Sequence, residues 1–348
     1  MNAFRGRAFA CCSAAVLAAC TGVRLERSDA VFYRPTAPGT EAMFDPLRMS
    51  LQYVLDGSQI EGTNLDRYDD HLQLVWDHLR EPVHTIATGD GGWRDFVNSE
   101  IAPIDADNAD DSIAILPNVF LHTLGGGMLF RKTAEWLEAH DAPAPWFTAG
   151  VLSMVTEVLA EASEKPTTDD TDEIADVLLY RPLGLWLFAD AQRSTWVRDN
   201  LRLVDWPYLL VWDVDDGEFA NVGMNYALRP KWFESADTSL FAHLGISNVF
   251  GLSHRLVGTR RLAWGVGAST ETVKPVELRW TAGLFFEDDG GLLASLLANC
   301  ADGYAVRANA YPGAMFAADV PLGLFAGVRD DGDITIGVQF ELPIGLGF

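Results

Sequence analysis

The sequence has 348 residues, 49% of them hydrophobic, and its 49 acidic side chains against 25 basic ones give a formal net charge of −24. Contacts to phosphates need Lys and Arg, so this charge excludes nucleic acid as a partner. It also excludes a broad basic surface for anionic lipids, while the length suffices for two structural units.

The amino terminus has the features of a bacterial signal peptide over residues 1–19. Two arginines precede an apolar stretch that is too short to span a bilayer. The stretch ends in Leu17-Ala18-Ala19-Cys20, which resembles the lipobox of lipoproteins, where cleavage precedes a cysteine that then carries lipid. Thr21, where an Asp would resemble an inner-membrane retention signal, favours the outer membrane. The alternative is an ordinary signal peptide with a chance cysteine.

The cysteines predict no disulfide. Cys11 and Cys12 would leave with the signal and Cys20 would be acylated, so Cys300 would remain alone. A lone thiol in an apolar strand is expected to act as a small hydrophobe. The spacing of the cysteines resembles no zinc or iron–sulfur site.

Replacement of Cys20 by Ser is expected to abolish labelling of the protein with radioactive palmitate, because serine offers no thiol for acylation. Cys300→Ser is the control and should be labelled as fully as the wild-type protein. Label that persists in Cys20→Ser would contradict the lipid anchor.

An apolar α-helical unit is expected over residues 61–175, behind a lipid-anchored tether of residues 20–60 that mixes polar residues with Pro and Gly. Its first helix is predicted over Leu65–Leu79, and residues 88–111 are predicted to be a loop. His71 and His78 lie seven residues apart on that helix. They could bind a metal with a third ligand, but the solvent-facing side of an amphipathic helix is the simpler interpretation.

The second half of this unit contains an apolar block, Ile113–Leu137, and a helix from about Trp146 to Ser163. One face of that helix carries valines, and another carries Glu157, Glu161 and Glu164. Residues 166–170 then supply Pro, Thr and Asp, which suit the capping of a following helix.

From about residue 200 the apolar period changes from 3.6 to 2, which predicts antiparallel strands in a unit of residues 176–348. Leu178–Phe188 is included as an additional strand. Three Asp-Asp-Gly turns, starting at Asp215, Asp288 and Asp330, separate the alternating runs. A calcium site around the first of these turns is the competing interpretation, but its ligand pattern is incomplete.

Residues 334–348 alternate without a break and place eight apolar side chains on one face of an extended strand. Such a strand would aggregate at a water-exposed edge, but not with that face in lipid. The predicted fold class is therefore α+β, with a membrane-associated α-helical unit followed by a small antiparallel outer-membrane β-barrel of about 8–10 strands. A soluble sandwich is the alternative. The expected lumen of the barrel is polar and carries both charge signs: Asn221, Asn225, Arg229, His243, Ser247, Glu277, Arg279, Arg307, Asn309, Asp319, Gln339 and Glu341.

The segment of residues 118–187 carries a series of short motifs: Asn118, His122, glycines at 125–127, Arg131, Glu157, Glu161, Glu164, residues 166–170 and Pro182-Leu183-Gly184. This order resembles an uncharacterised group of bacterial envelope proteins, classified only as a domain of unknown function, with a similar Asn…His, Arg, Glu and Pro-Ser-Asp pattern beside barrel strands. The sequence departs from that pattern at Leu124, because no proline follows the histidine. The resemblance implies an envelope location and supplies no reaction.

The side chains themselves suggest limited chemistry. His122 with Glu157 or Glu161 could form a general base and its orienting carboxylate. Arg131 could pair with a carboxylate or a lipid phosphate. Together with Asn118, Asp169 and Asp170, these groups equally fit a structural or lipid-binding polar network, because buried polar groups need partners. No Gly-x-Ser-x-Gly nucleophile motif is present, and neither a cofactor nor a metal is expected.

The expected location is the outer membrane, with a lipid anchor and an inserted barrel. The leading hypothesis is envelope structure, assembly or lipid binding, and the alternative is an envelope-lipid hydrolase or acyltransferase. A solute channel is the third class, and a barrel of this size is expected to conduct nothing. The expected partners are outer-membrane lipids and the machineries for barrel assembly and lipoprotein sorting.

Overall fold

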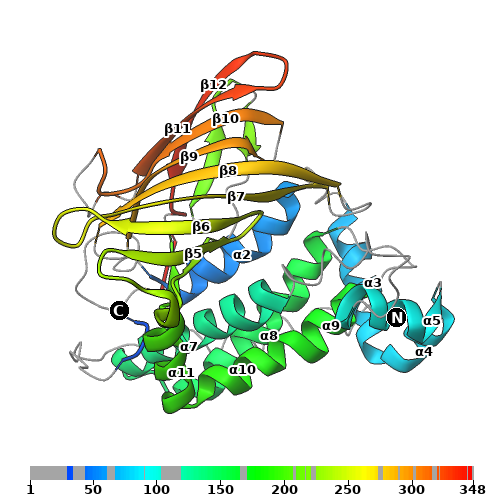
Figure 1. Cartoon of the computed structure of the whole chain (residues 1–348). Coiled ribbons are helices and arrows are strands. Elements are labelled where there is room, and N and C mark those ends of the chain that lie inside the picture. Colours follow the sequence, from blue (N-terminus) through cyan, green and yellow to red (C-terminus); the bar gives the residue numbers. More distant parts are fainter. Residues whose placement is uncertain are drawn as a thin grey trace.

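The computed structural model describes residues 30–33, 44–60, 67–89, 91–102, 119–164, 171–206, 209–215, 217–220, 225–272, 277–288, 291–300, 303–315, 320, 322–342 and 344–346. A curved antiparallel sheet lies over a layer of helices (Figure 1). This α+β arrangement confirms the coarse fold class, because helices precede strands along the chain with little mixing.

The helices occupy the first part of the described chain and continue to Leu201. They are α2 (Pro46–Ile60), α3 (Tyr68–Arg80), α4 (Pro82–Thr88), α5 (Gly92–Phe96), η2 (Val97–Ile101), η5 (Val119–Gly125), α7 (Gly126–Ala139), α8 (Pro145–Ser163), α9 (Asp172–Ala175), η6 (Asp176–Tyr180), α10 (Arg181–Ala189), α11 (Ala191–Trp196) and η7 (Val197–Leu201). Here η2, η5, η6 and η7 are π-helical turns. Both helices predicted from periodicity are confirmed, as α3 and α8.

Three segments differ from their prediction. Residues 46–60, assigned to the tether, form α2, and residues 92–101, assigned to a loop, form α5 and η2. Leu178–Phe188, included as a strand, is helical in η6 and α10. Its apolar run is short enough to fit either a strand or a buried helix, so periodicity alone does not decide between them.

The strands begin at residue 204 and pair only antiparallel with their neighbours. They are β1 (Val204–Asp205), β2 (Leu210–Asp213), β3 (Glu218–Ala220), β4 (Tyr226–Leu228), β5 (Thr238–Leu244), β6 (Ser247–Arg255), β7 (Arg261–Thr272), β8 (Glu277–Asp288), β9 (Gly291–Cys300), β10 (Tyr304–Ala310), β11 (Leu322–Arg329) and β12 (Ile334–Phe340). A short 3₁₀ turn, η8 (Lys231–Phe233), lies between β4 and β5.

The prediction of a closed barrel of 8–10 strands is wrong. Among the described residues the sheet has twelve strands, and its order β1-β4-β5-β6-β7-β8-β9-β10-β11-β12-β2-β3 leaves β1 and β3 at two open ends. The sheet is nevertheless strongly curled, because Asp205 at one end and Leu210 near the other are only five residues apart. Five residues of extended chain reach about 17 Å at most.

The two faces of the sheet differ, because the outer one is mainly apolar and the inner one is mixed. The outer face exposes large apolar side chains, among them Phe250, Trp264, Val266, Trp280 and Ile336. The inner face buries apolar clusters, around Phe285 and Phe325, and polar side chains beside them. This confirms the predicted inward position of Asn225, Arg229, His243, Ser247, Arg307, Asn309 and Gln339. The described part of the sheet therefore exposes an apolar outer face in addition to the apolar groups that it buries inside.

Polar side chains of the inner face pair with one another. Glu287 accepts a hydrogen bond from Arg229 at 2.5 Å, and Asn309 accepts from Gln339 at 2.9 Å. Asp213 accepts from the hydroxyl groups of Tyr304 and Thr335 at 3.0 and 2.5 Å, and from Arg329 at 3.2 Å. A calcium ion at the first Asp-Asp-Gly turn would need the carboxylate of Asp213, which these donors already occupy. That turn joins β2 and β3 as a hairpin.

The last strand is shorter than the alternating pattern predicts. It ends at Phe340, and Leu346 packs instead against the apolar core between helices and sheet. Asp45 fixes this segment, because one of its oxygens accepts from the backbone N–H of Leu346 at 2.7 Å. The other oxygen caps α2 at the N–H groups of Leu47 and Arg48.

Glycines bring the helices close together. A Cβ on Gly127 would lie 2.5 Å from the Phe188 ring, and one on Gly184 would lie 2.5 Å from the carbonyl of Thr123. These positions fall in two of the motifs noted in the sequence. The two glycines allow the backbone of α10 to contact the backbone at the junction of η5 and α7.

Helix α8 has its acidic face inward and part of its apolar face outward. Glu157 and Glu161 are buried, whereas Phe147, Val151 and Val155 are exposed. Exposed Leu183 and Trp186 on α10 add to this outer apolar surface. None of the described helices is both long enough and apolar enough to cross a bilayer.

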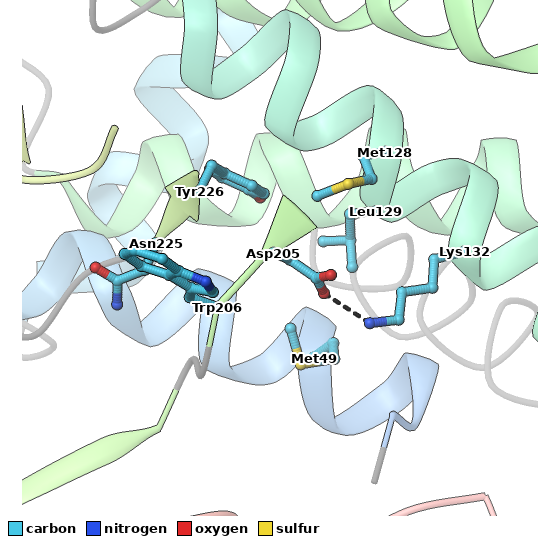
Figure 2. Close-up of a pocket in the computed structure, with 8 residues that line it drawn as sticks. All are labelled: Met49, Met128, Leu129, Lys132, Asp205, Trp206, Asn225 and Tyr226. Carbon is cyan, nitrogen blue, oxygen red and sulfur yellow. Dashed lines mark hydrogen bonds and ion pairs between the residues drawn. The ribbon is translucent and has the colours of Figure 1, made fainter. Parts of the chain in front are cut away.

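An ion pair joins the helices to the sheet, among mostly apolar side chains (Figure 2). Lys132 of α7 is buried and donates to Asp205 of β1 at 2.6 Å. The cavity beside this pair, lined also by Met49, Met128 and Tyr226, has a volume of about 20 Å³. It has room for about one water molecule, so we do not regard it as a ligand site.

Candidate functional site

A histidine and a glutamate from different helices form the centre of the candidate site. The Nδ1 atom of His122, on η5, lies 2.6 Å from Oε1 of Glu157, on α8. The Glu157 side chain is fully buried and that of His122 is 12% exposed. The pairing that the sequence suggested between these two residues is therefore confirmed as a contact.

A buried arginine holds the second oxygen of Glu157. Arg181, the first residue of α10, donates to Oε2 of Glu157 and, at 2.5 Å, to the hydroxyl of Tyr53 on α2. Its guanidinium also lies 5.0 Å from the centre of the Tyr53 ring. A Cβ on Gly126 would meet this guanidinium at 1.9 Å, so only glycine leaves room for it there.

This arrangement fixes the tautomer of His122. Glu157 pairs with Arg181 and so is a carboxylate, which can only accept hydrogen bonds. His122 must then donate from Nδ1, which leaves a lone pair on Nε2. Burial, helped by the charge of Arg181, lowers the pKa of His122 to about 4, so its imidazole is neutral at pH 7.

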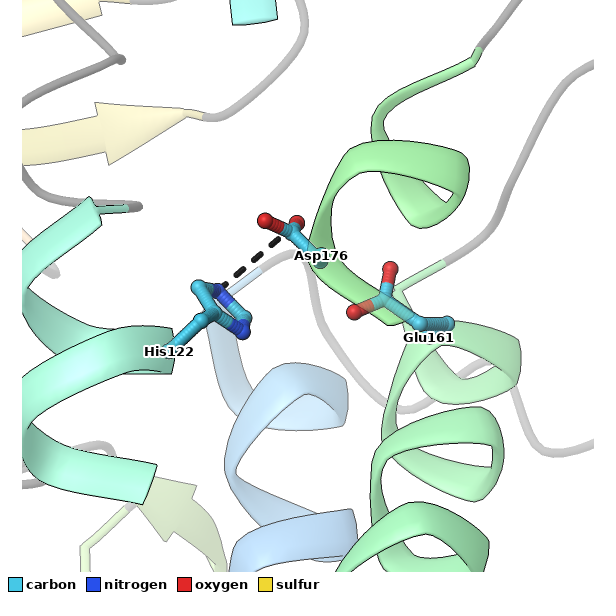
Figure 3. Close-up of side chains that lie close together, drawn as sticks. All are labelled: His122, Glu161 and Asp176. Atoms are coloured by element: carbon cyan, nitrogen blue, oxygen red, sulfur yellow. Dashed lines mark ion pairs between the residues drawn. The ribbon is translucent and has the colours of Figure 1, made fainter. Parts of the chain in front are cut away.

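Two further carboxylates face the free nitrogen of His122 (Figure 3). Oδ2 of Asp176, at the start of η6, lies 3.7 Å from Nε2. Glu161, one turn after Glu157 on α8, completes a group whose ligand atoms all lie within 4.8 Å of one another. Both carboxylates are buried, and each has one oxygen with no hydrogen-bond partner.

The surroundings of this group are acidic. Burial, followed by the charge of Glu164, raises the pKa of Glu161 well above its usual value, and burial followed by Asp172 does the same for Asp176. Burial also raises the pKa of Glu173 to about 7, against the hydrogen bond that it makes with His78.

The two histidines of α3 are not on a solvent-facing side, as the sequence suggested. His71 and His78 are both buried, and His78 contacts Glu173 of α9. The amphipathic pattern of α3 gave a wrong prediction, because the face that carries these histidines packs against the acidic end of another helix and not against water. Among the described residues, neither histidine belongs to a group of three or more potential metal ligands that lie close together.

Replacement of Glu173 by Gln is expected to change how stability depends on pH. A carboxyl whose pKa is raised to about 7 in the folded protein stabilises the fold below its unfolded value of 4.5, and this contribution is lost as the pH rises to about 7. Relative to the wild-type protein, Glu173→Gln should therefore gain about 1–3 kcal/mol in free energy of unfolding between pH 4.5 and pH 8. Thermal melts over this range measure it, and a constant difference would refute the prediction.

The other predicted site residues lie elsewhere in the structure or outside its described part. Arg131 pairs with a carboxylate, one of the two partners predicted for it, and this carboxylate is that of Glu135 at 2.5 Å. Glu135 in turn accepts from three consecutive backbone N–H groups, of Val31, Phe32 and Tyr33, at 2.8–2.9 Å, so this pair holds a segment within the predicted tether. The predicted residues Cys20, Asn118, Asp169 and Asp170 lie outside the described residues.

Three residues of the site were missed. Tyr53 lies in the expected tether, and Arg181 and Asp176 lie in the segment assigned to strands. The available signal was the Arg181-Pro182 pair: a proline in second position suits the first turn of a helix, which would have placed Asp176 on the preceding turn.

Comparisons with known proteins do not extend this description: no protein-family model, no curated protein and no solved structure matches the chain. The resemblance to an uncharacterised envelope group therefore stays a prediction from the motifs. What the chain does has to be inferred from its own surfaces and its own site.

Proposed function

We propose that this chain is an outer-membrane protein, anchored through acylated Cys20, whose curved sheet lies against envelope lipid. The observation that carries the proposal is the outer face of the sheet, which exposes large apolar side chains, while the inner face buries polar side chains together with apolar ones. Strands of membrane barrels alternate in this sense, whereas soluble sheets bury their apolar face.

Strand length supports the same proposal. The central strands β6, β7, β8 and β9 have 9, 12, 12 and 10 residues. Tilted strands that span a bilayer need about 9–11 residues. The exposed apolar surface of α8 and α10 gives the helical unit a second surface suited to lipid. The function that fits is envelope structure, assembly or lipid binding, with lipids and the barrel-assembly and lipoprotein-sorting machineries as partners.

Extraction of cell envelopes tests this proposal. The full-length protein should fractionate with outer membranes, resist extraction by alkaline carbonate, and dissolve only when detergent is added. Cys20→Ser separates the two attachments, because a sheet inserted in lipid holds the protein in the membrane without the anchor. A protein that dissolves freely and as a single species without detergent would overturn the proposal.

A second candidate function is hydrolysis or acyl transfer on an envelope lipid. The specific observation is the neutral His122, oriented by Glu157 and with a lone pair on Nε2. Such an imidazole can accept a proton from water or a hydroxyl group. The test is lipid profiling of cells that carry wild-type protein, His122→Ala or a deletion of the whole gene. A lipid species that changes alike in both mutants supports this function, and unchanged lipids in the deletion strain refute it.

A further inference from the structure

We propose that His122, Glu161 and Asp176 bind a divalent transition-metal cation. The three side chains come from η5, α8 and η6 and converge on one point (Figure 3), with their ligand atoms all within 4.8 Å of one another. A nitrogen and two carboxylate oxygens form a donor set that suits Zn²⁺, Mn²⁺, Fe²⁺ or Co²⁺. This inference goes beyond the proposed location and does not depend on it.

The first argument is that the described groups facing this point are all acceptors whenever the two carboxyl groups are ionised. The donor of His122 is used by Glu157, so Nε2 presents only a lone pair. It faces Asp176 at 3.7 Å, which is too long for a hydrogen bond. Glu161 adds a further carboxylate. Acceptors gathered in a buried place repel one another unless a proton or a cation lies between them.

The second argument is the unsatisfied oxygens. Oε1 of Glu161 and Oδ1 of Asp176 are buried without a hydrogen-bond partner, and each residue is only 3% exposed. Buried polar atoms without partners are rare, and an ion is one of the few groups that account for them. Arg181 does not serve this purpose, because its guanidinium donates to Glu157 and Tyr53.

The third argument is the support behind the histidine. Histidines that bind metals usually donate their other ring N–H to a carboxylate, which fixes the ring and increases its basicity. Glu157 provides that contact at 2.6 Å, and Arg181 immobilises Glu157 from its other side. His122 and Asp176 both lie on π-helical turns, which are frequent at functional sites.

The ligands need only a small adjustment to bind an ion. Bonds of about 2.0–2.2 Å to one cation place ligand atoms about 3–3.5 Å apart, and the His122–Asp176 pair is at 3.7 Å already. The 12% exposure of the His122 side chain gives the ion a way in. In the hydrolase candidate, the cation and not the imidazole would then activate water.

Co²⁺ titration of the detergent-solubilised full-length protein, stripped with EDTA, tests this site. We expect about one equivalent of Co²⁺ to bind, with a visible d–d absorption band that added Zn²⁺ removes. Glu161→Gln and Asp176→Asn should each weaken binding at least about tenfold, in line with the loss of a ligand. Glu173→Gln, a buried carboxylate of the same helical unit outside the three ligands, is the matched control and should bind within about threefold of the wild-type protein.

Melting temperatures separate a loss of metal binding from a loss of folding in these variants. Each amide removes a buried negative charge, so the metal-free variants should melt at or above the temperature of the metal-free wild-type protein. Zn²⁺ should raise the melting temperature of the wild-type protein and of Glu173→Gln only. A stripped wild-type protein that binds no Co²⁺ or Zn²⁺, or variants that bind as tightly as it does, would overturn the proposal and leave a pair of protonated carboxyls in its place.

Discussion

If the outer face of the sheet lies in lipid as proposed, replacement of Val266 by Arg is expected to destabilise the protein in a bilayer by about 2–4 kcal/mol, the cost of an arginine near the middle of a lipid-facing strand. Val266 lies in the middle of β7, is 57% exposed, and has Phe250 and Ala282 beside it on the neighbouring strands. Ile336→Arg on β12 should have an effect of the same sign. Urea titrations of protein folded into phospholipid vesicles measure both.

If the outer face contacted water instead of lipid, Val266→Arg would hardly change the stability of the protein. An exposed valine in a soluble protein tolerates Arg within about 0.5 kcal/mol, and solubility usually improves. Val257→Arg, in the exposed turn between β6 and β7, is the matched control and should be close to neutral. If Val266→Arg proves as harmless as Val257→Arg, the outer face of the sheet does not contact lipid.

Replacement of Arg181 by Met is expected to cost about 3–5 kcal/mol of unfolding free energy, because it leaves a buried carboxylate without its partner. Glu157 is completely buried, and Tyr53 loses its hydrogen-bond donor as well. His122 alone would remain as a partner for Glu157. Urea unfolding of the detergent-solubilised protein, followed by circular dichroism, measures the effect.

Two variants show whether the charge pair is the cause. Arg181→Met combined with Glu157→Met removes both charges and should recover most of the lost stability. Arg198→Met removes an arginine that pairs with the exposed Asp199, and it should cost less than about 1 kcal/mol. A double variant less stable than Arg181→Met alone would show that packing, and not the ion pair, makes Arg181 necessary.

The sequence was sufficient to predict the sheet and its two faces. Period-two alternation depends only on the pleat of a strand, so it correctly placed His243, Arg307 and Gln339 inside. Strand number and closure were not predictable in the same way, because they depend on where paired strands begin and end. Residues 219–229 alternate in the sequence, yet they contribute to two short strands, β3 and β4, at different places in the sheet.

The candidate site was predictable only in part. His122, Glu157 and Glu161 could be named because histidine and a row of glutamates stand out in an apolar segment. Asp176 and Arg181 could not, because their segment was assigned to strands and their partners are 54 and 24 residues away in the sequence. The spacing of residues within one helix can be read from the sequence. The convergence of η5, α8 and η6 cannot, because it depends on how the helices pack against one another at glycines.

Site-directed spin labelling tests the central claim, contact between the outer face and hydrocarbon, most directly. Single cysteines at Val266, Ile336 and Val257 would carry a nitroxide in a Cys300→Ala background, with the protein in phospholipid bilayers. Oxygen partitions into hydrocarbon and a nickel chelate stays in water. We predict collisions mainly with oxygen at Val266 and Ile336, and mainly with the nickel chelate at Val257. Nickel collisions as frequent at Val266 as at Val257 would contradict the account.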